Sequence, residues 1–352
     1  MNEDTLQTVD AWRHRGDDVA VATVVRTYRS APRPLGSIFA VSSSGDMAGS
    51  VSGGCVEGAI YGEAQELFGG ADTPKLLHYG ISDDFALDVG LACGGELWVA
   101  LDRHRDRPAL RRGAIAQVVT GEQAGRRRVL DADTGAFEGE IDGDLRATVE
   151  EEAREAVETE RSRSLDLEDG TLVFVESVHP APRMVVVGAV DTSEAVCKMA
   201  NILGWRTVVI DPRAKFATRE RLPSAQEIIV AWPDEAYERV GLERADSVIV
   251  LTHDPKVDDP AISEALRRGA SYVGALGSRR TQATRRERLL ESGVPEVDLD
   301  RVHGPVGLDI GAATPQETAV SIVAEVIGAR AGRSGRNLTA TTGRIHATVE
   351  GG

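Results

Sequence analysis

The apolar positions in the C-terminal half of the chain form short hydrophobic runs, separated by stretches with helical spacing. The runs are rich in Val and Ile and have the length of buried strands. They lie at 184–188, 207–211, 227–231, 247–253 and 271–277. Strands that alternate with helices form a parallel sheet with helices on both faces. This half is therefore predicted to be a doubly wound, Rossmann-like α/β domain.

The N-terminal part mixes strand-like and helical patterns and is predicted to be an α+β domain over residues 1–102. Its β-branched strand "VAVATVVRTY" is followed by a proline- and glycine-containing loop and a hairpin pattern. The predicted elements are a helix over 4–14, a strand over 19–28, a hairpin turning at Gly45–Asp46, a helix after Gly54, and strands over 75–79 and 96–101.

The middle segment, residues 103–182, is predicted to be a smaller β-rich module that links the two domains. "AIAQVVTG" and "TLVFVESV" have strand patterns, and residues 146–160 have the pattern of an exposed charged helix. The two prolines of "HPAPR" (179–183) mark the end of the module, because proline interrupts both helices and strands. The C-terminal domain then covers 183–330, and the Gly-, Arg- and Thr-rich tail 331–352 is expected to be flexible.

Composition and charge narrow the class of protein. The net charge of −16 argues against a nucleic-acid-binding protein, which needs a basic face. Only four of the 40 basic residues are lysines, and this acidic, lysine-poor composition fits either a halophile-like surface or a GC-rich source. The chain has no apolar run long enough to span a membrane, and its polar N-terminus does not resemble a secretory signal. A cytoplasmic protein is expected. Three cysteines without CxxC spacing argue against a structural zinc site or a disulfide scaffold.

The first turn of the C-terminal domain has an altered dinucleotide motif. Gly188 ends one predicted strand and Asp211 the next, as in a Rossmann unit that binds pyrophosphate and ribose. However, the turn reads "GAVDTS", with Val190 and Ser193 where the motif has glycines and with the negative charge of Asp191 beside them. Two interpretations stay open: an altered nucleotide site, or a scaffold whose turn no longer binds. NAD(P) is therefore a doubtful cofactor.

Polar residues at other strand ends mark a candidate crevice, because open α/β sheets bind ligands at the carboxyl ends of their strands. His253 follows one strand, and Gly277-Ser278-Arg279-Arg280 follows the next as a candidate anion-binding turn. The loop "GPVGLDIGAATPQE", which contains Asp309, leads into a helix predicted over 315–330 and capped by Thr314 and Glu317. The alternatives are a hydrogen-bonded structural histidine and a solvated pair of arginines.

Several motifs together closely resemble the XdhC/CoxI family, the accessory factors of xanthine dehydrogenase and related molybdenum hydroxylases. They are "ATVVRTYRSAPRPLGS", "GSVSGGCVEGAI", "GLACGGELWV", "YVGALGSRRTQATRRERL" and "RVHGPVGLDIGAATPQETAVSIVAEVI". The resemblance covers most of 15–102 and 183–330, and the middle segment matches poorly. It implies an N-terminal XdhC/CoxI domain and a C-terminal Rossmann-like domain.

The resemblance also implies a function. Such proteins bind molybdenum cofactor (molybdopterin), protect it during sulfuration and help to insert it into the apoenzyme of a xanthine dehydrogenase-type or CO dehydrogenase-type hydroxylase, without turnover of their own. A cysteine desulfurase is a further implied partner, and the resemblance allows a homodimer. The alternative is an NAD(P)-dependent oxidoreductase with a base near His253.

The family's cysteine motifs map onto Cys55 in "SGGCVEG" and Cys93 in "ACGG", which makes these two thiols the candidates for contact with molybdenum or sulfur. A thiolate suits a soft metal, and a nearby helix N-terminus stabilises it. Arg279 and Arg280 are candidates for the phosphate of the cofactor. The alternative for Cys55 and Cys93 is buried packing, and Cys197 is expected in the core. The other candidate cofactor-binding residues are Gly53, Gly54, Glu57, Gly94, Gly95, Gly188, Asp211, His253, Gly277, Ser278 and Asp309.

Overall fold

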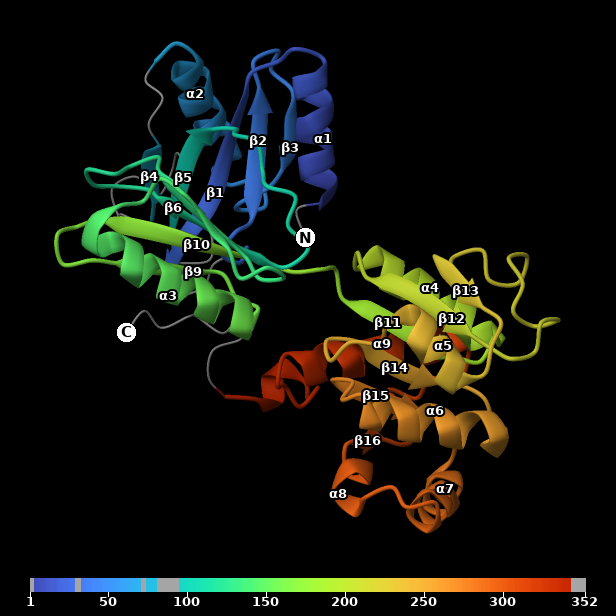
Figure 1. Ribbon diagram of the computed structural model, residues 1–352. Helices are drawn as coiled ribbons and strands as arrows, with labels where there is room; N and C mark the ends of the chain where they lie inside the picture. The colour runs from blue at the N-terminus through green and yellow to red at the C-terminus, as the bar shows by residue number, and fades with distance from the viewer. Residues whose placement is uncertain (1–2, 29–32, 71–73, 81–94, 343–352) are drawn as a thin grey trace. The chain divides into compact units, whose positions relative to one another are not determined.

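The computed structural model describes residues 3–28, 33–70, 74–80 and 95–342 (Figure 1). Contacts within the chain divide it into two units, one reaching to Pro180 and the other formed by Ala181–Thr342. Each unit has its own hydrophobic core. Within the described residues, no helix is both long and apolar enough to cross a membrane.

The first unit begins with an antiparallel sheet of order β3-β2-β1-β5-β4. Alternate residues of β1 point to opposite faces, and those that include Ala22 and Val24 pack under α2. All elements predicted for this region are confirmed. They are α1 (Glu3–His14), β1 (Val19–Tyr28), β2 (Ile38–Ser42), β3 (Met47–Gly49), α2 (Glu57–Phe68), β4 (Lys75–Tyr79) and β5 (Glu96–Arg103).

The middle segment forms a second antiparallel sheet, of order β8-β7-β6-β10-β9, with one helix on its face. The predicted exposed charged helix is present, but one side of it is buried, because Val149, Ala153 and Ala156 form an apolar stripe against the sheet. The elements are β6 (Gly113–Val118), β7 (Arg127–Asp131), β8 (Phe137–Gly139), α3 (Gly143–Thr159), β9 (Arg163–Asp166) and β10 (Leu172–Val178).

The two sheets of the first unit meet through side chains on the faces that α2 and α3 leave uncovered. Val25 and Ala100 of the first sheet pack against Val119, Leu172 and Phe174 of the second. The first unit is therefore two antiparallel sheets with a shared apolar layer between them.

The second unit is a six-stranded parallel sheet of order β13-β12-β11-β14-β15-β16, as predicted for a doubly wound domain. The strand order reverses between β11 and β14, where such sheets bind ligands. Its strands are β11 (Arg183–Val187), β12 (Arg206–Ile210), β13 (Glu227–Ile229), β14 (Ser247–Val250), β15 (Tyr272–Ala275) and the unpredicted β16 (Val302–His303). Its helices are α4 (Asp191–Ile202), α5 (Pro233–Val240), α6 (Pro255–Arg267), α7 (Arg279–Glu291), α8 (Glu296–Leu299), α9 (Pro315–Arg330) and the 3₁₀ turn η1 (Leu338–Ala340).

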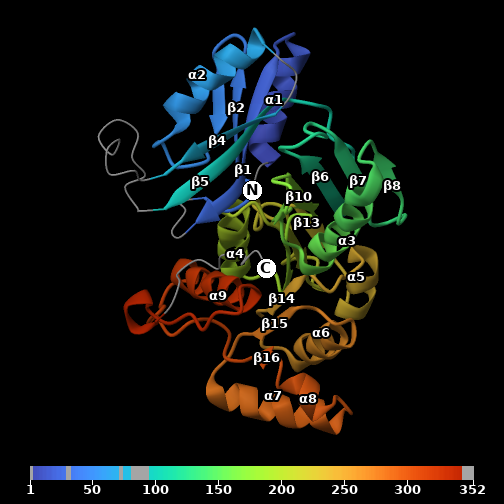
Figure 2. The ribbon, with the colours of Figure 1, turned by 90° about the vertical axis from the view of Figure 1, so that its left-hand side faces the viewer.

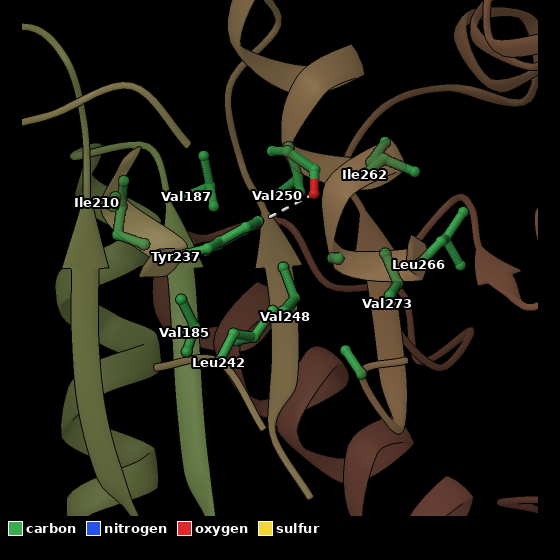
Figure 3. Packing of buried hydrophobic residues seen from close by; sticks show 14 of the residues in the cluster. Val185, Val187, Ile210, Tyr237, Leu242, Val248, Val250, Ile262, Leu266 and Val273 are labelled. Atoms are coloured by element: carbon green, nitrogen blue, oxygen red, sulfur yellow. Dashed lines mark hydrogen bonds between the residues drawn. The ribbon is translucent and has the colours of Figure 1, made fainter. Parts of the chain in front are cut away.

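Helices cover both faces of this sheet. Helices α4 and α9 lie on one face and α5 and α6 on the other, as Figure 2 shows. Alternate residues of β11 divide between the two cores: Val185 and Val187 face α5 and α6, and Val186 faces α4 and α9. In the first of these cores the hydroxyl of Tyr237 donates to the carbonyl oxygen of Ala261 at 3.1 Å (Figure 3), so that its one polar group is paired.

Candidate functional site

The loop that precedes α2 is organised by the carboxylate of Glu57, the first residue of that helix. One carboxylate oxygen accepts from the Ser50 hydroxyl at 2.6 Å and from the backbone N–H groups of Val51 and Ser52 at 3.0 and 2.9 Å. The other accepts from the Ser52 hydroxyl at 2.5 Å and from the N–H of Gly54 at 2.9 Å. Both oxygens of Glu57 are thus committed to the shape of the loop.

Glu57 is charged at neutral pH because its hydrogen bonds outweigh its burial. Burial on its own raises the pKa of the carboxyl. The hydroxyls of Ser50 and Ser52 and the backbone N–H of Ser52 act in the opposite direction and lower the pKa to about 2. The loop therefore contains a fixed negative charge on its inner side.

The outer side of the same loop is open. Gly53 and Gly54 have φ angles of +79° and +113°, a region that favours glycine, and a Cβ atom on either would meet no atom of the described residues within 4 Å. Cys55 follows them, and its thiol is exposed. Its backbone N–H donates to the hydroxyl of Ser52 at 2.9 Å, which fixes the position of the residue. The alternative in which Cys55 is a buried packing residue is wrong.

The other two cysteines differ from Cys55. Cys197 is fully buried in the core against α9, as predicted, and burial raises the pKa of its thiol to about 12. Cys93 and Gly94 lie outside the described residues. Gly95 is buried directly before β5. Cys55 is therefore the exposed thiol in the described part of the chain.

In the second unit, the turn after β11 is closed by the protein itself. Gly188 has a φ of +110°, and a Cβ there would lie 2.5 Å from the methyl group of Thr252. The fully buried carboxylate of Asp211 accepts from the N–H of Ala189 at 2.7 Å. It also accepts from the Arg213 guanidinium, at 2.9 Å from Nε and 2.7 Å from Nη2.

The residues that replace the motif glycines fit this closed turn without strain. Val190 has an ordinary φ of −115°. The hydroxyl of Ser193 donates to the carbonyl oxygen of Gly188 at 2.5 Å and caps the turn from within. Asp191 is exposed at the first position of α4.

The residues predicted at the ends of β14 and β15 lie at the same carboxyl edge of the sheet. His253 is exposed and makes no side-chain hydrogen bond to the described residues, so the structural-histidine alternative is not supported. Ser278 caps α7 by accepting from the N–H of Thr281 at 3.1 Å, after Gly277 at a φ of +138°. Arg279 and Arg280 follow, exposed and without an ion pair to any described residue.

The glycine-dense loop before α9 ends in the predicted cap. The side chain of Glu317 accepts from the N–H groups of Ala313 and Thr314, and the Thr314 hydroxyl accepts from the N–H of Glu317 at 3.2 Å. Asp309 is exposed in the same loop. At the carboxyl edge of the sheet, His253, Arg279, Arg280 and Asp309 are therefore exposed to solvent, as are the carboxylates of Asp191 and Asp254.

Two family models match the chain. The XdhC Rossmann domain matches residues 184–326, and the XdhC and CoxI family model matches residues 12–80, so that together they cover more than half of the protein. The chain belongs to the XdhC/CoxI family. The predicted fold class, an N-terminal α+β XdhC/CoxI domain followed by a Rossmann-like domain, is confirmed.

Relatives of this XdhC/CoxI protein match along nearly its whole length. A protein of Bacillus subtilis that is named a probable xanthine dehydrogenase subunit is 28% identical over 334 residues, 92% of this chain and 96% of the relative. The molybdenum cofactor insertion chaperone PaoD of Escherichia coli is 27% identical over 315 residues, 90% of this chain and 84% of the relative. A crystal structure described as a xanthine dehydrogenase from Bacillus halodurans has 24% identity and a TM-score of 0.73, over 95% of this chain and 97% of that one. This last likeness supports the fold.

Sequence reasoning missed one buried ion pair beneath the exposed edge of the XdhC Rossmann domain. Asp258 and Arg285 are 1% and 2% exposed, and Arg285 Nη2 lies 2.7 Å from Asp258 Oδ2. Arg285 also donates to the side-chain oxygen of Gln282 at 2.6 Å and to the carbonyl oxygen of Leu276 at 3.2 Å. The hydroxyl of Thr252 donates to the same Asp258. This pair ties α6 to α7 below Arg279 and Arg280.

No signal in the XdhC/CoxI sequence separates Arg285 from the four neighbouring arginines of its helix. In the described part of the chain, no group of three or more His, Cys, Asp or Glu side chains is arranged to hold a metal ion. Among the described residues, the candidate functional groups of this family member are thus the exposed thiol of Cys55 in the first unit and the polar residues at the carboxyl ends of the parallel strands in the second.

Proposed function

We propose that this XdhC/CoxI protein is an accessory factor that binds molybdenum cofactor and assists its sulfuration and insertion into a molybdenum hydroxylase of the xanthine dehydrogenase or CO dehydrogenase type. Its membership of the family supports this function. A relative that matches 90% of the chain is named a molybdenum cofactor insertion chaperone. The cofactor is the cargo of such a protein rather than its own catalytic group.

The observation that carries the proposal is the exposed thiol of Cys55 on a glycine loop held from inside by Glu57. Molybdenum in the cofactor is bound through sulfur, and a cysteine sulfur suits either the soft metal or a sulfur atom in transfer. Among the residues that the structure describes, no side chain lies within 4 Å of the Cβ positions of Gly53 and Gly54, which precede Cys55. The paired carboxylate of Glu57 holds the loop in this open form and is not itself available to the cargo.

The phosphate of the cofactor needs cationic partners, and we assign this role to Arg279 and Arg280. Both guanidinium groups are exposed in the first turn of α7, where the backbone N–H groups add to the attraction for an anion. Cys93 with Gly94 and Gly95, Gly277, Ser278, His253 and Asp309 remain candidate cofactor contacts in the proposal. Gly188 and Asp211 belong to the closed turn and are left out of it.

The test is cofactor retention by full-length protein purified from cells that make molybdenum cofactor. Molybdopterin is measured by the fluorescence of its oxidised form and molybdenum by mass spectrometry. We expect Cys55→Ala and Cys93→Ala to retain about tenfold less cofactor, equivalent to about 1.4 kcal/mol of binding free energy. Cys197→Ala is the matched control, because that thiol is buried. Retention at the wild-type level in both test variants would refute the role of the thiols.

The proposed partners are the apoenzyme of a molybdenum hydroxylase and a cysteine desulfurase, in the cytoplasm. The chain is proposed to act as a maturation factor without turnover of its own, with a homodimer as its candidate assembly. Transfer is tested by mixing loaded protein with the apo-hydroxylase and measuring the hydroxylase activity that appears. Activity that appears equally fast with unloaded protein and free cofactor would count against insertion by this chain.

The second candidate function is an NAD(P)-dependent oxidoreductase, which the strand order of the second unit favours. The closed turn counts against it, because Asp211 is already paired with Ala189 and Arg213 and Thr252 covers Gly188. Calorimetric titration with NAD(H) and NADP(H) separates the two functions. We expect no binding below millimolar concentration, and micromolar binding would favour the oxidoreductase.

A further inference from the structure

The short segment between β15 and α7 is held in place by side chains of α7 itself. The guanidinium of Arg285 is 2% exposed and donates to the carbonyl oxygen of Leu276 from both Nη1 and Nη2, each at 3.2 Å. The side-chain amide of Gln282 donates to the carbonyl oxygen of Ala275 at 2.8 Å. The last carbonyl group of β15 and the first one after it are therefore both bound by the helix that follows.

Arg285 is itself fixed by a buried network. Its Nη1 donates to Gln282 Oε1 at 2.6 Å, and its Nη2 donates to the carboxylate of Asp258 on α6 at 2.7 Å. Asp258 is 1% exposed, and its other oxygen accepts from the hydroxyl of Thr252. Burial raises the pKa of Asp258, so its charged form depends on these two partners. The network thus leaves the guanidinium of Arg285 a single position.

The segment that this network holds carries the groups that the proposed function assigns to the phosphate of the cofactor. Gly277 has a φ of +138°, and Ser278 caps α7. Arg279 and Arg280 follow and are exposed. The backbone N–H groups of these four residues have no acceptor among the described residues. The direction of all these donors depends on the position of the backbone immediately before them.

We propose that Arg285 is a positioning residue for the anion-binding turn at the start of α7, with Gln282 as its assistant. Arg285 is buried and does not touch the anion; it acts by fixing the carbonyl group of Leu276 and, through it, the turn. The inference rests on the proposed function, because it takes the phosphate contacts of Arg279 and Arg280 from there. It adds the residues that keep those contacts aligned.

The planar fork of the guanidinium suits this role. Nη1 bonds Leu276 and Gln282, and Nη2 bonds Leu276 and Asp258, so that one rigid group ties the turn to both helices. A lysine at this position supplies the same charge to Asp258, but from a single nitrogen without the fork. The variant Arg285→Lys therefore keeps the charge of the network and removes its geometry.

Arg288 offers a matched control on the same helix. It also pairs with α6, because its Nε and Nη2 lie 2.7 and 2.9 Å from the two carboxylate oxygens of Asp259. Its side chain is 34% exposed, and within the described residues it makes no hydrogen bond to the segment between β15 and α7. Arg288→Lys therefore alters a second ion pair between α6 and α7 without disturbing the turn.

The experiment measures the molybdopterin retained by full-length variants that are purified from cells that make molybdenum cofactor. We expect the double variant Arg279→Gln, Arg280→Gln to retain about tenfold less cofactor than wild type. Arg285→Lys is expected to retain about tenfold less as well, whereas Arg288→Lys retains the wild-type amount. Gln282→Met removes the assisting amide without removing a charge, and we expect about threefold less.

A combined variant distinguishes positioning from a general loss of stability. Arg285→Lys is added to the double variant of Arg279 and Arg280, and its effect on retention is expected to fall from about tenfold to below about threefold. A substitution that only destabilises the second unit lowers retention equally in both backgrounds. Circular dichroism shows whether each variant is folded, and the neutral substitution Gln282→Met keeps the proposal testable if Arg285→Lys does not fold.

Failure of this inference differs from failure of the proposed function. The inference alone is overturned if the double variant loses cofactor while Arg285→Lys retains as much as Arg288→Lys. An equal effect of Arg285→Lys with and without the two exposed arginines also overturns it. Wild-type retention by the double variant refutes the phosphate contacts of Arg279 and Arg280, and this inference with them. A wild-type protein that retains no cofactor refutes the proposed function as a whole.

Discussion

The Cys55 loop and the turn after β11 have similar local structures, but the first is exposed to solvent and the second is covered by other groups of the protein. In each, a glycine with positive φ precedes a helix, and a carboxylate accepts a backbone N–H from the turn. Glu57 binds its loop from the inner side and leaves Gly53 and Gly54 open to solvent. Asp211 comes from the next strand and binds the turn at the place where Rossmann domains hold a ribose.

The difference shows that a glycine turn is an available binding site only when the protein's own groups leave its donors and its surface free. At the Cys55 loop, the carboxylate of Glu57 binds the backbone N–H groups from the inner side, and Gly53 and Gly54 stay exposed. At Gly188, Thr252 covers the surface and Asp211 occupies the donor of Ala189. Both of these residues are more than 20 positions away in the sequence, so the motif alone does not predict which turn is open.

Substitution of Gly188 and of Gly53 by alanine is expected to give the largest difference in unfolding free energy between the two turns. Gly188→Ala adds backbone strain and a collision with Thr252, and we expect it to destabilise the second unit by about 3–4 kcal/mol. Gly53→Ala adds only the strain of a positive φ, about 1 kcal/mol for the first unit. Urea unfolding, fitted with a transition for each unit, measures both. Equal losses would mean that the two turns do not differ in packing.

Removal of the carboxylate that closes the second turn has the next largest effect. Asp211→Ala leaves the buried N–H of Ala189 unpaired and deprives Arg213 of its partner. We expect the second unit to lose about 2–3 kcal/mol of unfolding free energy. Asp191→Ala is the control, because among the described residues its exposed carboxylate makes only a 3.5 Å ion pair with Arg221, and we expect a change within about 0.5 kcal/mol. A loss below about 1 kcal/mol for Asp211→Ala would contradict the closed-turn description.

The fold was largely predictable because its buried strands are continuous apolar runs. The five predicted strands of the parallel sheet and the helix over 315–330 are present. Strands β7 to β9 were missed because short strands such as "RRVLD" contain few apolar residues, and β16 has only two residues. The stripe of α3 was missed because two of its three residues are alanines, which add little to a hydrophobic pattern.

The site was less predictable, because its arrangement depends on partners distant in sequence. Arg285 belongs to a helix whose charged sequence is typical of an exposed helix. Its burial depends on the ion pair with Asp258 on α6. Asp211 was correctly placed at the end of its strand, but its partner Arg213 was not foreseen. The role of Glu57 depends on the directions of N–H groups, which the φ angles of Gly53 and Gly54 determine.

The smallest of these effects is expected at the carboxylate of the open loop. Glu57→Gln keeps the size of the side chain but replaces one acceptor oxygen by a donor, which cannot accept from the loop N–H groups. We expect a loss of about 1–2 kcal/mol in the unfolding free energy of the first unit. Glu66→Gln on the same helix is the control: its side chain is 77% exposed and makes only a long, 3.7 Å ion pair with Lys75 among the described residues, and we expect a change within about 0.5 kcal/mol.

The pH dependence of this loss tests whether the charge of Glu57 holds the loop. The pKa of Glu57 is about 2 in the folded protein, below its ordinary value of 4.5, because hydrogen bonds outweigh burial. The unfolded chain therefore takes up the proton first as the pH falls, and the stabilising contribution, complete above 4.5, disappears towards 2. The difference between wild type and Glu57→Gln should stay constant from about pH 7 to about pH 5 and shrink below that, while Glu66→Gln shows no such trend. A difference that persists at about pH 2 would mean that the shape of the side chain, and not its charge, keeps the Cys55 loop open.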